Sequence, residues 1–136
     1  MPDLHGKILV VDDSQVIRNL LNEFLSDRGH DVDTAVDGLD GIEKALAGDY
    51  DLVFCDLHMP RRNGFQVYST VTETKPQTQF IMTDSLPDEL AAQAEAAGAC
   101  CCLTKPFDLI EVSDTVQRIL RTAEKECPKA TTKTSA

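Results

Sequence analysis

The sequence predicts an α/β fold: a doubly wound three-layer sandwich in which helices cover both faces of a five-stranded parallel sheet. The first observation is that short apolar runs alternate five times with segments whose apolar residues recur at helical spacing. The second is that most of these runs are apolar at every position, as a strand must be when helices cover both of its faces. Right-handed crossovers between such strands and helices produce the sandwich.

Five segments are expected to form the strands. Four are short continuous apolar runs, which suit the interior of a parallel sheet, and one alternates between polar and apolar residues. The runs are ILVV (8–11), LVFC (52–55), FIM (80–82) and CCCL (100–103), and the alternating segment is DVDTAV (31–36).

Five helices are expected between and after the strands, at residues 14–28, 39–46, 64–74, 86–97 and 109–123. Their apolar residues lie three or four positions apart, so each helix has one apolar face. Glycine closely follows the first, second and fourth of these segments, and Pro76 follows the third, which are typical helix ends. Ser14 or Asp13 is placed to cap the first helix, and Asp108 to cap the last.

Composition indicates a single globular domain. The chain has 136 residues, of which 42% are apolar and 26% charged, which is ordinary for a folded domain. The net charge of −10 disfavours non-specific binding to nucleic acid or anionic lipid, since both require basic residues. No apolar run approaches the roughly 20 residues of a membrane span, and the N-terminal MPDLHGK lacks the features of a signal peptide. A cytoplasmic location is therefore expected.

The five cysteines are expected to be free thiols in a reducing compartment. No CxxC pair occurs in the sequence. Three cysteines are consecutive (100–102), so in a strand they point to opposite faces and cannot all bind one metal ion.

The folded domain is expected to span residues 1–126. From Cys127 onward the sequence is polar and rich in small residues. Residues 127–136 are therefore expected to form a polar tail or the start of a linker.

Polar side chains follow four of the five expected strands. Asp12 and Asp13 follow the first, Asp56 the third, Thr83 the fourth and Lys105 the fifth. The carboxyl ends of parallel strands meet at one edge of the sheet, where doubly wound proteins bind their ligands. An aspartate there commonly caps a helix, and a lone lysine is commonly solvated, but five such residues at four strand ends together indicate a functional site.

The motifs that carry these residues are VVDDS, VFCDLHMPRRNG, FIMTDS and LTKPF. In this order and at these separations they resemble the receiver domain of two-component response regulators, over Lys7 to about Glu126. The resemblance implies a flavodoxin-like sheet of strand order 2-1-3-4-5. It also implies a signalling domain rather than a turnover enzyme. Such a domain accepts a phosphoryl group from a sensor histidine kinase or a phosphotransfer protein.

In this family the aspartate that ends the third strand is the phosphoryl acceptor, which makes Asp56 the acceptor here. Three neighbouring carboxylates repel one another and an anionic donor, and a hard divalent cation with oxygen ligands removes both problems. The resemblance implies Mg²⁺ as this ion, with Asp13 and Asp56 as direct ligands and Asp12 holding a metal-bound water. The backbone carbonyl of His58 is implied as the third protein ligand.

Two further residues are implied to contact the phosphoryl oxygens: Lys105 through its ammonium group and Thr83 through its hydroxyl. The Lys105–Pro106 bond is expected to be cis, which would aim the lysine back across the strand ends. Movement of Thr83 toward the phosphoryl group should then repack the surface formed by the fourth helix, the fifth strand and the fifth helix, where partners bind.

The sequence departs from the family pattern at several positions near this site. Cys102 stands where the family carries a switch aromatic, so signalling by a rotating ring is in question. Asp84 follows Thr83, where a small residue is usual, and its side chain is expected to point outward because a fourth carboxylate in the site would oppose phosphorylation. His58 and Ser85 occupy positions that tune phosphoryl lifetime. His58 could position a water or cover the site, and Ser85 could simply cap a helix.

Two other classes of protein are disfavoured. A haloacid-dehalogenase-type phosphatase requires a second aspartate where His58 stands, and a flavodoxin-type electron carrier requires a Ser/Thr-rich loop after the first strand. The remaining alternative is a pseudo-receiver, an interaction module that works without phosphorylation, which Asp84 and Cys102 favour. The kinase, the downstream target or output domain and the oligomeric state are left open, and a homodimer through the partner-binding surface is one arrangement.

Overall fold

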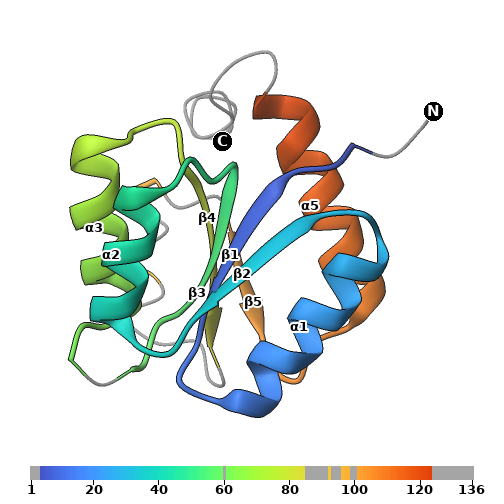
Figure 1. The fold of residues 1–136 in the computed structure, drawn as a ribbon, viewed down its shortest axis with the longest axis horizontal. Helices are drawn as coiled ribbons and strands as arrows, with labels where there is room; N and C mark the ends of the chain where they lie inside the picture. The colour runs from blue at the N-terminus through green and yellow to red at the C-terminus, as the bar shows by residue number, and fades with distance from the viewer. Residues whose placement is uncertain (1–3, 60, 85–91, 93–95, 99–100, 124–136) are drawn as a thin grey trace.

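The computed structural model describes residues 4–59, 61–84, 92, 96–98 and 101–123. Within them, five parallel strands form one sheet of order β2-β1-β3-β4-β5, and four helices pack against it (Figure 1). The strands are β1 (Lys7–Val11), β2 (Asp31–Ala35), β3 (Leu52–Asp56), β4 (Gln79–Asp84) and β5 (Cys101–Thr104). The helices are α1 (Gln15–Asp27), α2 (Gly38–Ala47), α3 (Gly64–Thr74) and α5 (Leu109–Ala123).

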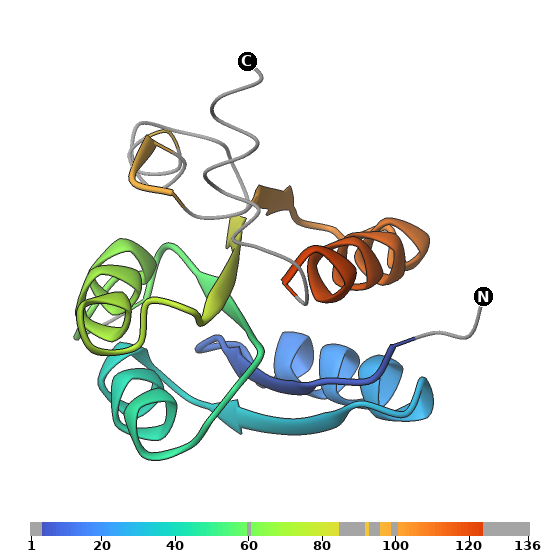
Figure 2. The same cartoon turned by 90° about the horizontal axis from the view of Figure 1, so that it is seen from above.

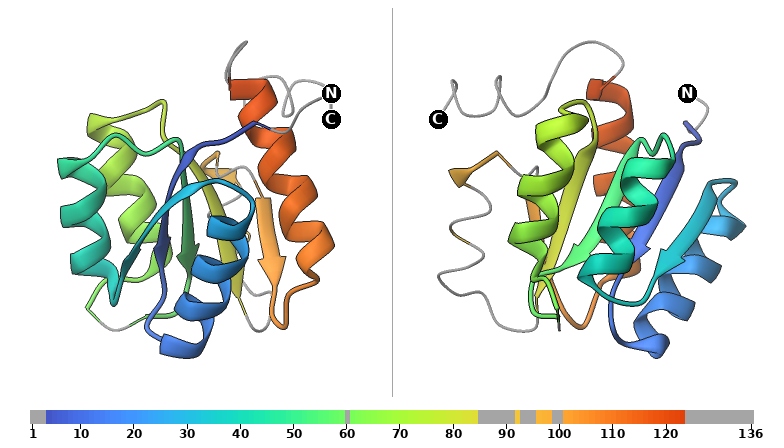
Figure 3. Two further views of the ribbon diagram at one scale, coloured as in Figure 1. Left: turned by 45° about the vertical axis from the view of Figure 1, so that its right-hand side comes forward. Right: turned by 60° about the vertical axis from the view of Figure 1, so that its left-hand side comes forward.

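The doubly wound sandwich and its strand order are confirmed. Helices α2 and α3 cover one face of the sheet, and α1 and α5 cover the other (Figures 1 and 2). The parallel strands end at a common edge of the sheet (Figure 3). The helix expected at 86–97 lies almost wholly outside the described residues, and the tail expected at 127–136 lies outside them entirely. None of the helices in the described part of the chain has the length and apolar character that crossing a membrane requires.

Alternate residues of each buried strand pack into two separate apolar cores, one on each face of the sheet. In β1, Ile8 and Val10 contribute to the core beneath α1 and α5, whereas Leu9 and Val11 contribute to the core beneath α2 and α3. Strands β3 and β4 follow the same alternation. This burial on both faces explains why the sequence of these strands is continuously apolar.

Strand β2 lies at an edge of the sheet and is the least buried of the first four strands. Asp31 and Asp33 are exposed and alternate with half-buried Val32 and Thr34. The Tyr50 hydroxyl donates a 2.7 Å hydrogen bond to the Asp33 carboxylate. Burial of the ring and this hydrogen bond raise the pKa of Tyr50, so the phenol keeps its proton.

The start of α3 packs directly on the end of β3. Asn63 caps the helix and forms a capping box with Gln66, which fixes where the helix begins. A Cβ atom on Gly64, the first helical residue, would lie 2.6 Å from the carbonyl oxygen of Asp56 and 2.9 Å from Cα of Leu57. Only glycine allows the helix to approach the strand this closely.

Replacing Gly64 by alanine should therefore lower the free energy of unfolding by about 1–3 kcal/mol, because the helix or the end of β3 must shift to admit the methyl group. Urea denaturation monitored by circular dichroism measures this loss. Gly48→Ala is the matched control, since a Cβ there would meet the movable ring of Tyr50 at 2.9 Å rather than backbone. Equal losses in the two variants would contradict the backbone packing described here.

Candidate functional site

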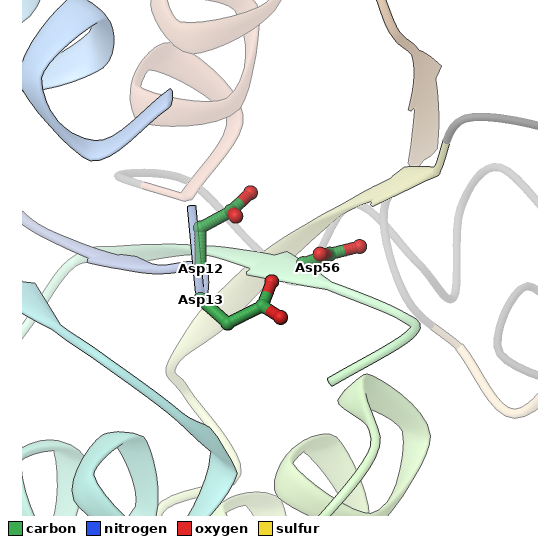
Figure 4. A group of neighbouring side chains, drawn as sticks. All are labelled: Asp12, Asp13 and Asp56. Atoms are coloured by element: carbon green, nitrogen blue, oxygen red, sulfur yellow. The ribbon is translucent and has the colours of Figure 1, made fainter. Parts of the chain in front are cut away.

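Three carboxylates gather at the edge of the sheet where the strands end. Asp12 and Asp13 follow β1, and Asp56 is the last residue of β3 (Figure 4). One carboxylate oxygen from each residue lies within 4.8 Å of the other two. The three aspartates that were predicted from the sequence as metal ligands are thus brought together.

Strand alternation and register place Thr83 beside this group. Two residues before each of Asp12, Asp56 and Thr83, the same strand places an apolar side chain in the core beneath α1 and α5. Asp56 and Thr83 are also direct neighbours in the register of β3 and β4. All three side chains therefore point to the same side of the sheet.

The three carboxylates differ in their exposure to solvent. Asp12 is 1% exposed and Asp56 is 6% exposed, whereas Asp13 is exposed. A buried carboxylate requires hydrogen bonds or a nearby cation. The backbone N–H of Ser14 donates to Asp12 at 2.8 Å, and that of His58 donates to Asp56 at 3.3 Å.

The ammonium group of Lys105 lies between the two buried carboxylates. Its Nζ atom is 2.9 Å from Oδ2 of Asp12 and 3.3 Å from Oδ2 of Asp56. The backbone N–H of Lys105 donates to the carbonyl of Asp84 at 2.8 Å, and the Lys105–Pro106 bond is cis, as expected. Burial lowers the pKa of Lys105, but the hydrogen bonds and charges of the two aspartates outweigh it and leave the pKa raised. The lysine therefore stays charged.

A single lysine does not neutralise the site. Burial and then the charge of Asp12 raise the pKa of Asp56 from 3.8 to about 6, against the opposing effects of Lys105 and the N–H of His58. Excess negative charge and several carboxylate oxygens within a short distance are the conditions that suit a hard divalent cation. The donor set of Asp12, Asp13 and Asp56 thus fits a metal site.

Asp84 was expected to point out of the site, and the structure shows that its side chain is buried rather than exposed on the loop. Its side chain is 3% exposed, and Oδ2 lies 3.6 Å from Nε2 of His58. Because Asp84 follows Thr83 in β4, strand alternation turns its side chain to the side of the sheet opposite Thr83. An imidazole can offer such a carboxylate a positive charge or an N–H group. The side chain is therefore neither in the solvent nor beside Thr83.

The other positions singled out in the sequence are only partly covered by the described residues. Ser85 lies outside them, and for Cys102 the structure describes a place in β5 but not the side chain. Cys55 is a free buried cysteine, as expected. Burial, followed by the charges of Asp56 and Asp12, raises the pKa of its thiol, so that it remains protonated.

Sequence reasoning missed two arginines, one that contacts the backbone of the site and one in the loop after β3. Arg18 donates a 2.7 Å hydrogen bond to the carbonyl oxygen of Asp12. It lies one turn after Ser14, the cap of α1, and this spacing could have indicated it. Arg61 has a positive φ of 74° and pairs with Asp37, the cap of α2, at 3.1 Å. No local pattern in the sequence connects these two residues.

Comparison with known proteins identifies the family. Residues 8–127 match the family model described as the response regulator receiver domain. The chain belongs to this family. It is therefore a receiver domain of the two-component systems, in agreement with the arrangement of Asp12, Asp13, Asp56 and Lys105.

Two groups of relatives differ in how much of their length this receiver domain covers. The chemotaxis protein CheY of Halobacterium salinarum is 36% identical over 115 residues, which cover 84% of this chain and 96% of CheY. The transcriptional regulatory protein ResD of Bacillus subtilis is 36% identical over 117 residues, which cover 86% of this chain and 49% of ResD. The chain thus spans nearly the whole of the first relative and about half of the second.

Solved structures show the same fold. CheY4 of Vibrio cholerae superposes with a TM-score of 0.78 at 32% identity, covering 85% of this chain and 99% of CheY4. TrrA of Thermotoga maritima, solved in complex with Mg(2+)-BeF, gives a TM-score of 0.77 at 32% identity and covers 83% of this chain and 97% of TrrA.

The raised pKa of Asp56 predicts a pH dependence of stability in metal-free protein. The ordinary pKa of the Asp56 carboxyl is 3.8, and in the folded protein it is about 6. The folded form therefore holds this proton more tightly than the unfolded form, and the resulting stabilisation is complete at pH values below 3.8. It is lost as the pH rises through about 6. Thermal unfolding in the presence of chelator should therefore show a wild type that loses stability, relative to Asp56→Asn, between about pH 4 and about pH 7.

At the upper pH, Asp56→Asn should be more stable than the wild type by about 1–2 kcal/mol, a value reduced to allow for solvent screening. The Asp56→Asn variant is the control for the wild type, since it has no charge to lose at this position. A constant difference between the two proteins across the pH range would show that repulsion at Asp56 is not the cause.

Proposed function

We propose that this receiver domain accepts a phosphoryl group on Asp56 from a sensor histidine kinase or a phosphotransfer protein. One observation carries the proposal: a buried carboxylate at the end of a central strand lies 3.3 Å from the Lys105 ammonium group and beside two further aspartates. A purely structural ion pair would require no third carboxylate. This combination suits a site that receives an additional anionic group together with a cation.

In the proposed transfer, a carboxylate oxygen of Asp56 attacks the phosphorus atom of the donor. The bond between phosphorus and the donor atom breaks, the leaving group takes the electron pair, and an acyl phosphate forms on Asp56. Lys105 supports this step because its ammonium group is already held against the acceptor and can neutralise phosphoryl oxygens. Thr83 would offer its hydroxyl from the neighbouring strand.

We further propose that the bound ion is Mg²⁺, held by Asp12, Asp13, Asp56 and the backbone carbonyl of His58. When bound, Mg²⁺ supplies positive charge that offsets repulsion between the carboxylates and the phosphoryl oxygens. The support is the cluster of three carboxylates together with the raised pKa of Asp56. Exposed Asp13 gives an ion access from solvent, whereas Asp12 and Asp56 hold their positions in the interior.

The proposed output is a change in the surface that includes β5 and α5. Ile110, in the first turn of α5, is 72% exposed, which suits a contact with a protein partner. Lys105 connects this surface to the acceptor, since it lies between β5 and α5 and contacts Asp56. A downstream protein, an output domain or a second copy of the chain would recognise the altered surface.

A pseudo-receiver is the second candidate, and one observation favours it. Asp84 adds a buried carboxylate at the end of β4, close to a site that must admit an anion. Strand alternation turns Asp84 to the side of the sheet opposite Thr83, which weakens this objection. Direct measurement of phosphorylation separates the two candidates.

Incubation with acetyl phosphate and Mg²⁺ should add one phosphoryl group to the wild type, as measured by intact mass. Asp56→Asn should show no gain, because the amide lacks the nucleophilic carboxylate oxygen. Chelation of the metal should abolish the gain in the wild type. A folded wild type that shows no gain would establish the pseudo-receiver instead.

Mg²⁺ should also raise the melting temperature of the unphosphorylated wild type, because an ion that binds only the folded form stabilises it. Asp13→Asn should lose most of this increase, since it removes a proposed ligand. Asp33→Asn, which removes an exposed carboxylate on β2, is the matched control and should keep the increase. An equal increase in all three proteins would mean that Mg²⁺ acts on general surface charge rather than at the site.

A further inference from the structure

Arg18, near the start of α1, contacts the turn that carries two of the three clustered aspartates. Its Nη1 atom donates a 2.7 Å hydrogen bond to the main-chain carbonyl oxygen of Asp12. Asp12 is only 1% exposed, and it lies just beyond the last residue of β1. A carbonyl at the end of a buried strand needs a donor, and here a charged side chain of the following helix supplies it.

This hydrogen bond also acts on Asp13, through the peptide that joins the two aspartates. The carbonyl of Asp12 and the N–H of Asp13 belong to one planar unit, so the bond from Arg18 restricts the rotation of that unit. On the other side of Asp13, the N–H of Ser14 donates to Oδ1 of Asp12 at 2.8 Å, which holds the next peptide unit. Both peptide units that flank Asp13 are thus held by a hydrogen bond.

The start of α1 provides a fixed base for the Arg18 side chain. Ser14 caps the helix, and its hydroxyl accepts a 3.4 Å hydrogen bond from the N–H of Ile17. The N–H of Arg18 donates to the carbonyl of Ser14 at 3.0 Å. Arg18 is half-buried, and its side chain turns back from the helix to the end of β1. The guanidinium group can therefore act as a rigid support for the turn.

We propose that Arg18 is a positioning residue for the metal site, and that its hydrogen bond to the carbonyl of Asp12 orients Asp13 to bind Mg²⁺. The inference rests on the proposed function, in which Asp13 is a ligand of the ion. Asp13 is exposed, so packing does little to hold it, and the two hydrogen bonds on either side of it supply the order instead. Loss of a residue that orients a metal ligand commonly weakens binding by roughly 10–100-fold.

Positioning and charge have opposite effects on the affinity for a cation. Arg18 brings a positive charge to the end of β1, and this charge by itself repels Mg²⁺. Removal of the charge should therefore tighten Mg²⁺ binding if charge is the main effect, and loss of positioning should weaken it. An arginine that only satisfied the carbonyl would contribute to the stability of the fold without altering Mg²⁺ binding. The direction of the change in the dissociation constant thus separates the three roles.

The test is a titration of the unphosphorylated full chain with Mg²⁺ at constant ionic strength, in which amide chemical shifts measured by NMR give the dissociation constant. Arg18→Gln should raise the dissociation constant by about tenfold, because the shorter, neutral side chain no longer holds the carbonyl of Asp12. Arg18→Lys keeps a charged donor and should restore part of the affinity.

Arg28→Gln is the matched control, because it removes the same charge from the other end of α1. Arg28 caps that end of the helix, and its guanidinium lies 4.9 Å from the centre of the Phe24 ring. Its dissociation constant for Mg²⁺ should equal that of the wild type. The melting temperature in the presence of chelator establishes that each variant is folded. If Arg18→Gln is not folded, Arg18→Lys replaces it and should show a smaller rise in the dissociation constant.

The outcomes separate this inference from the proposed function. A wild type that does not bind Mg²⁺ removes the proposed metal site and this inference with it. A wild type that binds Mg²⁺, together with Arg18 variants that bind it as tightly or more tightly, overturns the inference alone. An equal loss of affinity in Arg28→Gln would also overturn it, since the effect would then not depend on the contact with Asp12. Loading with acetyl phosphate tests the proposed phosphoryl transfer separately.

Discussion

The contact of one ammonium group with two buried carboxylates is the interaction on which the rest of the site depends. Without Lys105, the low exposure of Asp12 and Asp56 would leave two negative charges in the interior, where backbone N–H groups are the hydrogen-bond donors to them that the described residues provide. The lysine comes from the far end of the sheet, after β5, and reaches Asp12 after β1. It therefore links the ends of strands that are not neighbours.

A single geometric rule organises both the interior and the site. Alternate side chains of a strand point to opposite faces, which divides the apolar residues between two cores. Beyond the last apolar residue of each strand, the same alternation places Asp56 and Thr83 on one side of the sheet and Asp84 on the other. A difference of one position in β4 thus decides whether a polar group faces the acceptor or the loop before α3.

The fold and the main site residues could be predicted because their evidence is local. Most strands are short apolar runs, and the polar residue at the end of a run or just after it can be identified without knowing what it contacts, as for Asp56 and Lys105. The burial of Asp84 could not be predicted by the same means, since it depends on segments that are distant in sequence. The pairing of Asp84 with His58 and that of Arg61 with Asp37 are likewise tertiary contacts between loops, whose conformations no periodicity specifies.

The exposed aspartates of β2 have a consequence for how the chain behaves at high concentration. An edge strand offers unpaired backbone groups to which a strand of another molecule can add, and this is a common route to aggregation. Two copies joined along β2 would bring Asp31 and Asp33 of each close to those of the other, in a chain whose net charge is already −10. Like charges across such a junction oppose it. The aspartates of β2 therefore oppose extension of the sheet from one molecule into the next.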